Sequence, residues 1–396
     1  MPIAAVPNYL GTDFQHASPG MRFGMYLKLW EGSAWSKSKD KPLDGAKRLN
    51  DCDKQTMREL LARQKQVFVV AVATEAAFQL DALATAPFTT GLGNEHPLEN
   101  GFAFLNPYGL PYLPGSGIKG VLRQEARELA RGDWGDTQGW DAAAINALFG
   151  KESSDGDIDH LRGALSFWDV IPQIAGDSLT VEIMTPHQSH YYQHGQSPHE
   201  SGQPNPISFL TVPPKSRFVF HVQCDLAYLN RLAPSLVASD CWKVLLDAAF
   251  HHAFNWLGFG AKTAVGYGAM QENPAAKAEH EQKEAEGRAE AERLAKEARR
   301  QTMTPEELAW EERQPTIEQF RRLFDAARAA PYQPGGQFDN QRMGFMKTAL
   351  DWQDKRSRNA AAELLRETMT KVWGMPGKKE TKQRFQEAIE QLGSQT

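Results

Sequence analysis

The chain has 396 residues, enough for two domains or for one large domain with an appendage. Its formal net charge is −5, and neither residues 1–270 nor the remainder carries the basic excess of a free-standing nucleic-acid binder. No apolar run approaches the roughly 18 residues that span a bilayer, and the three cysteines show no C-x-x-C spacing. We therefore expect a cytoplasmic protein with reduced thiols.

The first half of the chain predicts a polar segment followed by alternating strands and helices. Residues 1–65 read as a polar N-terminal segment packed on the core, and the apolar run 66–73 as a buried strand. A Pro/Gly-rich approach then leads to Ser116, which we expect to be the N-cap of a helix over 117–131. A second short helix is expected over 142–149.

The second half of the core predicts more strands and one strong helix. The expected strands cover 164–170, 179–184, 207–212 and 217–224. The apolar spacing predicts a helix over 238–257, which a Gly-rich run joins to a closing strand over 267–271. The order strand, helix, strand, strand, helix, strand indicates an α+β, ferredoxin-like core with insertions.

After residue 273 the composition changes. Residues 275–300 are nearly all Ala, Glu, Lys and Arg, which favours a solvated helix or a short coiled coil, so we expect a charged helical linker over 274–303. Residues 304–396 indicate a helical extension that starts at Thr304 and breaks at Gly335. We therefore divide the chain into 1–65, 66–273, 274–303 and 304–396.

The Gly-rich run is the first candidate site. Its glycines, which include Gly258, Gly260 and Gly266, permit positive φ and leave successive N–H groups free to cradle a phosphate. Lys262 adds a charge beside Thr263, and Tyr267 offers a ring on which a base can stack. A tight turn whose glycines serve only packing explains the same residues. The run matches neither the Walker A nor the dinucleotide-binding fingerprint.

The start of the helix over 117–131 is the second candidate. Free N–H groups and the positive dipole end favour an anion there, and Lys119 and Arg123 lie one turn apart. An ordinary helix start with two exposed cations explains the same pattern.

A His-rich loop is the one apparent enzyme candidate. It holds His187, His190, His194 and His199, but no thiolate is near and prolines interrupt it. We expect no metal and no cofactor here. The pair His251-His252 on the strong helix is interpreted as packing or surface.

Several ordered blocks together resemble the RAMP superfamily of CRISPR-associated proteins, and within it the sixth subunits of type III-B (Cmr) complexes. The resemblance covers about residues 66–271 and rests on these blocks: 91–97, 111–120, 148–150, 167–172, 184–187, 204–212 and 257–268. It implies a ferredoxin-like (RRM-like) RAMP core with insertions, followed by a C-terminal helical extension without a counterpart in the family.

The resemblance also implies a function. We expect a non-catalytic scaffold subunit at the crRNA 3′ end of an RNA-targeting effector in antiviral defence, with crRNA, target RNA and other Cmr-type RAMP subunits as partners and no membrane. The expected RNA-binding residues are Ser116, Lys119, Arg123, His187, Gly258, Gly260, Lys262, Thr263, Gly266 and Tyr267. The alternative is a metal-independent endoribonuclease that processes precursor crRNA with His187 as general acid or base.

Overall fold

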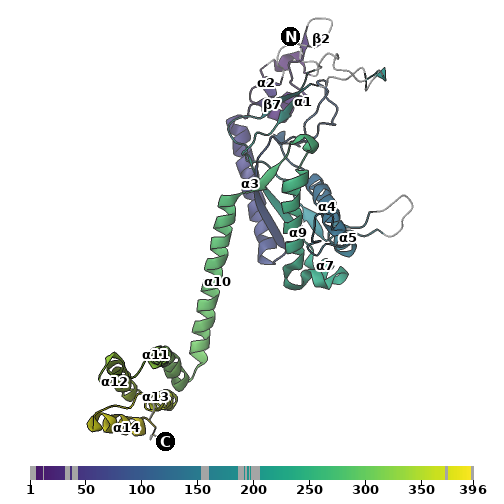
Figure 1. Cartoon of the computed structure of the whole chain (residues 1–396). Coiled ribbons are helices and arrows are strands. Elements are labelled where there is room, and N and C mark those ends of the chain that lie inside the picture. Colours follow the sequence, from purple (N-terminus) through teal and green to yellow (C-terminus); the bar gives the residue numbers. More distant parts are fainter. Residues whose placement is uncertain are drawn as a thin grey trace. The chain divides into compact units, whose positions relative to one another are not determined.

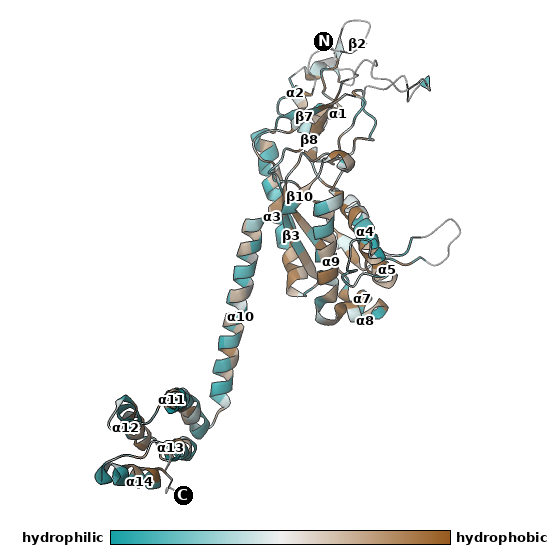
Figure 2. Cartoon of the chain, viewed as in Figure 1, coloured by the Kyte–Doolittle hydropathy of each residue, from teal (hydrophilic) through white to brown (hydrophobic). Residues whose placement is uncertain are grey.

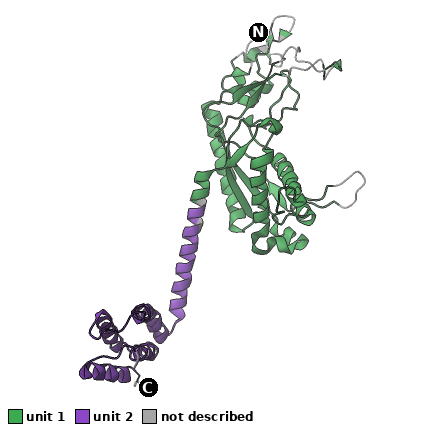
Figure 3. Ribbon diagram, in the orientation of Figure 1, with its two compact units in different colours: residues 1–280 green, residues 281–396 purple. Residues whose placement is uncertain are grey.

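The chain forms two compact units, residues 1–280 and residues 281–396 (Figure 3). The computed structural model describes residues 6–11, 13–31, 36–37, 43–152, 160–185, 191, 194–195, 197, 206–370 and 373–393. Among these residues, no helix has an apolar stretch long enough to cross a membrane.

A four-stranded antiparallel sheet organises the first unit. Its strand order is β10-β3-β9-β6, and two helices flank it. In chain order these elements are β3 (Ala77–Ala84), α4 (Gly115–Arg131), β6 (Leu165–Phe167), β9 (Arg217–Cys224), α9 (Cys241–His252) and β10 (Met270–Glu272) (Figure 1). The first and third strands in sequence are therefore neighbours at the centre of the sheet.

Strand β9 shows how the sheet is covered on both faces. Successive side chains of a strand point to opposite faces. The Phe220 ring lies 5.0 Å from Phe250 of α9. The next residue, His221, lies on the opposite face, 4.6 Å from the ring of Phe68 in helix α3 (Asp51–Ala73). The predicted strand over 217–224 is confirmed.

Helix α3 corrects the prediction of a buried strand over 66–73. The helix begins with a capping box between Asn50 and Asp53 and continues through these residues, so it also runs across the predicted boundary at residue 65. Most of the apolar run is solvent-exposed rather than buried, at the four valines Val67, Val69, Val70 and Val72. Propagation of an established helix has outweighed the β propensity of the valines.

Smaller elements complete the first unit. The hairpin of β7 (Thr180–Met184) and β8 (Ile207–Thr211) forms a separate antiparallel sheet. The short strands are β1 (Trp30–Glu31), β2 (Ser36–Lys37), β4 (Phe104–Leu105) and β5 (Leu110–Pro111). The remaining helices are η1 (Asn8–Leu10), α1 (Pro19–Gly24), α2 (Asp44–Lys47), α5 (Ala142–Phe149), α7 (Leu226–Leu232), α8 (Pro234–Val237), η2 (Ala238–Asp240), η3 (Ala253–Leu257) and η4 (Thr263–Val265).

Two predicted elements differ in extent. The expected strand over 164–170 is ordered as β6 over only three residues. The helix expected over 238–257 is α9, preceded by a kink at Ser239 and Asp240, which both have positive φ, and followed by the π-helical turn η3. The short helix over 142–149 is confirmed as α5.

The second unit is helical. Helix α10 (Pro274–Thr302) begins in the first unit, which ends at residue 280, and continues into the second. Hydrophilic residues recur along its whole length (Figure 2), and its described side chains are almost all exposed. Helices α11 (Pro305–Arg328), α12 (Gln337–Leu350), α13 (Lys355–Glu367) and α14 (Lys379–Gly393) enclose a separate apolar core. Arg342 is fully buried there, where it donates to the carbonyls of Thr368 and Gly374. Because a buried guanidinium needs acceptors, these bonds fix α12 against the segment that joins α13 to α14.

Candidate nucleic-acid interface

The Gly-rich run, residues 258–268, joins η3 to β10 beside the β7–β8 hairpin. Its base is buried at Gly258, Phe259 and Gly268, whereas its tip over 264–266 is exposed. The predicted helix-to-strand connection is therefore present, with its central residues at the protein surface.

Close backbone packing explains two of the glycines. A Cβ on Gly268, whose φ is +71°, would lie only 1.8 Å from the carbonyl oxygen of Phe259. A Cβ on Gly260, with φ +93°, would lie 2.3 Å from the carbonyl oxygen of Thr89. Gly258 and Gly266 also have positive φ. The glycines thus let the run fold back on itself and against the irregular segment that follows β3.

The expected cradle of successive free N–H groups is wrong for much of the run. The N–H of Phe259 donates to the Gly268 carbonyl, that of Gly268 to Pro87, and that of Ala261 to Thr89. The N–H groups of Gly258 and Gly266 are also paired within the backbone. A donor committed to a carbonyl cannot bind a phosphate without breaking that bond, so the polar side chains of the run, Lys262 and Tyr267, are the better ligands.

Lys262 and Tyr267 meet over the β8 side chain Phe209. The Lys262 Nζ lies 5.7 Å from the centre of the Phe209 ring and 2.9 Å from the sulfur of Met184. The Tyr267 ring is 5.6 Å from the Phe209 ring, and burial, followed by the charge of Glu182, raises the pKa of its hydroxyl. A thioether is a weak acceptor, so Lys262 keeps donors for an anion.

Helix α4 begins differently from the prediction. Ser116 is not the N-cap: Pro114 occupies that position, and Ser116 is an exposed residue inside the first turn. The Asp169 carboxylate, which follows β6, instead accepts the Gly115 N–H at 2.7 Å. An anion of the chain itself thus occupies part of the expected anion site.

The two cations of α4 are also partly committed. Arg123 donates to the Gly150 carbonyl at 2.6 Å and lies 3.6 Å from the Glu152 carboxylate. Burial, and then the neighbouring Arg123, lowers the pKa of the Lys119 ammonium. Within the described ranges, no hydrogen bond, ion pair or ring contact joins this pair to Lys262 or Tyr267. The sequence-predicted residues therefore form two separate patches.

His187 lies outside the described residues, as do His190 and His199. The loop that holds them connects β7 to β8, and it leaves β7 just after Met184. Because Met184 contacts Lys262, the start of this loop lies at the Gly-rich run. Sequence spacing alone did not reveal this proximity.

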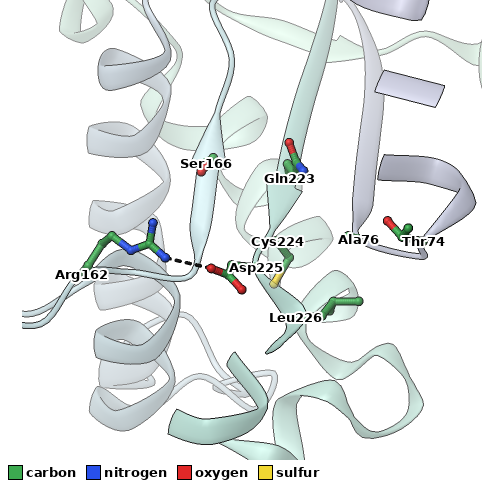
Figure 4. Close-up of a pocket in the computed structure, with 8 residues that line it drawn as sticks. All are labelled: Thr74, Ala76, Arg162, Ser166, Gln223, Cys224, Asp225 and Leu226. Carbon is green, nitrogen blue, oxygen red and sulfur yellow. Dashed lines mark hydrogen bonds and ion pairs between the residues drawn. The ribbon is translucent and has the colours of Figure 1, made fainter. Parts of the chain in front are cut away.

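A cavity of about 500 Å³ opens at the end of β9 (Figure 4). Its Arg162 side chain is paired with Asp225 at 2.9 Å. Burial raises the pKa of the Cys224 thiol to about 12, so this sulfur is held in its unreactive protonated form. The cavity offers binding space, but its thiol is not an activated nucleophile.

Sequence reasoning did not identify two supporting residues, Asp169 at the start of α4 and the buried Phe209 beneath Lys262 and Tyr267. Asp169 accepts the Gly115 N–H. Phe209 lies in a strand with no distinguishing motif. Both act on residues far away in sequence, which no local spacing signals.

Comparison with known proteins supports the predicted resemblance. Residues 82–271 match the sequence model of the RAMP superfamily. The chain is 31% identical over 230 residues to the CRISPR system Cmr subunit Cmr6 of Pyrococcus furiosus, an alignment that covers 46% of this chain and 64% of the relative. The chain thus spans less than two thirds of that relative's length.

Solved structures of CRISPR complexes also resemble the chain. A chain of the type III-B Cmr-beta complex bound to cognate target RNA shares 19% identity at a TM-score of 0.39, over 58% of this chain and 69% of that one. The crystal structure of Cmr6 from Pyrococcus furiosus shares 24% identity at a TM-score of 0.28, over 50% and 98%.

Proposed function

Since residues 82–271 match the RAMP superfamily, we propose that the chain is a non-catalytic, RNA-binding scaffold subunit of a type III-B CRISPR effector complex. In this proposal it lies at the crRNA 3′ end and contacts crRNA, target RNA and other RAMP subunits. The observation that carries the proposal is the 31% identity to a Cmr6 subunit. The sheet order and the two flanking helices support a ferredoxin-like RAMP core.

The surface of α3 supports membership of an assembly. Val67, Val69, Val70 and Val72 are each more than half exposed, at 55%, 57%, 69% and 57%. Single exposed apolar side chains are normal on a monomer, but a cluster on one helix is typical of a protein contact. We therefore place a neighbouring subunit on the C-terminal half of α3.

Two side chains of the Gly-rich run support RNA contact. Lys262 supplies a charge, and Tyr267, which packs against the buried Phe209, supplies a ring on which a base can stack. The sugar-phosphate backbone and an unpaired base are the RNA features that such a surface recognises. Local geometry in place of a net basic charge suits a subunit that binds RNA only within a complex.

The proposal is tested by purifying the tagged chain from cells that express a complete type III-B complex. Mass spectrometry should find RAMP subunits, and sequencing should find crRNA. Val70→Glu should remove the protein partners because it places a charge in the α3 cluster. Val244→Glu is the matched control, since Val244 is 63% exposed but stands on α9, away from that cluster.

A cleavage assay distinguishes the scaffold proposal from the alternative, an endoribonuclease. The contact between Met184 and Lys262 favours it as the second candidate, because it brings the start of the His187 loop to a cation. Purified chain incubated with precursor crRNA and chelator should leave the RNA intact. Cleavage that His187→Ala abolishes would replace the scaffold proposal with the endoribonuclease.

A further inference from the structure

Three potential metal ligands gather where α4 packs against α9. Glu125 and Glu128 are three residues apart on α4 and share one face of that helix, and His252 is the last residue of α9. The two helices lie side by side over the sheet (Figure 1), and one donor atom from each residue lies within 4.8 Å of the others. This cluster is separate from the Gly-rich run and from the start of α4.

The distances suit a small tetrahedral ion. The His252 Nε2 is 3.2 Å from a Glu125 carboxylate oxygen and 3.6 Å from one of Glu128. Zinc bonds of about 2.0–2.2 Å at a tetrahedral angle place two ligand atoms roughly 3.4 Å apart. The observed separations lie on either side of that value.

The burial of the cluster is the independent observation that points to a ligand. Glu125 is fully buried and His252 is 8% exposed. Neither carboxylate oxygen of Glu125, nor the His252 Nε2, has a hydrogen-bond partner among the described residues. Glu128 is partly exposed and accepts a hydrogen bond from Gln124 at 3.0 Å, so Glu125 is the buried carboxyl of the cluster that lacks a partner. Either a proton or a bound cation must neutralise a carboxylate in such surroundings.

The geometry points to a divalent transition-metal site, of which Zn²⁺ is the first candidate, formed by Glu125, Glu128 and His252. An imidazole ligand favours Zn²⁺ over Mg²⁺ or Ca²⁺, which prefer oxygen ligands. The Trp134 ring packs edge-on against His252 at 5.2 Å and covers the cluster on one side. Because the site joins α4 to α9, its role is structural: the ion fixes the helices that lead into and out of the two candidate RNA patches.

The test uses the full chain, stripped with chelator and dialysed against ZnCl₂ or MgCl₂, with bound metal measured by mass spectrometry. We expect one zinc ion per chain and no retained magnesium. Glu125→Gln and His252→Ala should each weaken zinc affinity about tenfold or more. The control is His251→Ala: the neighbouring histidine is partly exposed and faces Asp247 and Glu272, so zinc affinity should be unchanged.

Thermal unfolding shows whether a variant loses zinc only because it is misfolded. Glu125→Gln keeps the size of a buried side chain that has no hydrogen-bond partner, so without metal the variant should melt near the wild-type temperature, and zinc should raise the melting temperature of the wild type only. The inference is overturned if no saturable zinc binds, or if both variants keep wild-type affinity. Zinc that is lost on His187→Ala but retained on Glu125→Gln would also overturn it, because the ion would then belong to the His-rich loop.

Discussion

The Gly-rich run and the start of α4 have similar sequences, rich in glycine with a nearby lysine, but the structure uses them differently. At the start of α4 the chain supplies its own anion, Asp169, to the Gly115 N–H, and Arg123 is held by Gly150 and Glu152. In the Gly-rich run the base is closed by backbone bonds, while Lys262 faces only weak partners.

A segment whose sequence favours anion binding can form a site only if its N–H groups and cationic side chains are not already bonded to other parts of the chain. Glycine content is an equal argument for both segments, whereas the helix dipole favours an anion only at the start of α4, because the Gly-rich run follows the end of η3. What separates them is the set of partners contributed from distant parts of the chain. We therefore propose RNA contact first at Lys262 and Tyr267, and only second at Lys119 and Arg123.

The largest expected effect is a loss of stability, which should be greater for a glycine substitution at the base of the Gly-rich run than for one at its tip. Gly268→Ala should destabilise the chain by about 3 kcal/mol or more, because the new Cβ clashes with the Phe259 carbonyl at a positive φ. Gly266→Ala should cost only about 1–2 kcal/mol, since its φ is positive but no atom lies within 4 Å. Urea unfolding of the two variants measures both costs. Equal losses would show that the base is not the packed part of the run.

The free energy of unfolding should depend on pH through His221, which lies next to the segment that bonds the start of α4, by up to about 3 kcal/mol. Burial against Phe68 lowers the pKa of His221 to about 4, and the His221 carbonyl accepts the N–H of Trp168, the residue before Asp169. The unfolded chain binds the proton near pH 6.5 and the folded chain does not. Stability is therefore full above pH 6.5 and is lost as the pH falls toward 4.

His221→Leu isolates this contribution from the titration of carboxylates. The difference in unfolding free energy between wild type and variant should change between pH 6.5 and 4, with the wild type losing more. A difference that stays constant across this window would mean that His221 is accessible to protons in the folded chain.

The sequence predicted the elements in which local pattern and tertiary packing agree. Strand β9 alternates apolar and polar positions and α5 ends at a glycine, and both have the expected bounds. The prediction of a strand over the valine run is wrong because helix α3, which is capped by Asn50, extends through these residues. Local propensity cannot show that the valines lie on a surface, which depends on what α3 packs against.

The candidate sites were predicted less completely, for a related reason. The Ser116 cap failed because the carboxylate that bonds the helix start comes from Asp169, far along the chain. The contact of Lys262 with Phe209 and that of Glu125 with His252 also join residues that are distant in sequence. Residue types and spacing identified Lys262 and Tyr267, whereas their surroundings required the folded chain.

The most direct measurement of the central claim is guide RNA retention by the complex over a salt series, from about 50 mM to 500 mM. Lys262→Ala should weaken retention for every guide sequence and reduce the slope of log affinity against log salt by about 0.7, the value of one single-strand phosphate contact. Lys119→Ala should change the slope by less than half of that. Unchanged retention in Lys262→Ala, together with a clear loss in Lys119→Ala, would contradict the account and assign the RNA to the start of α4.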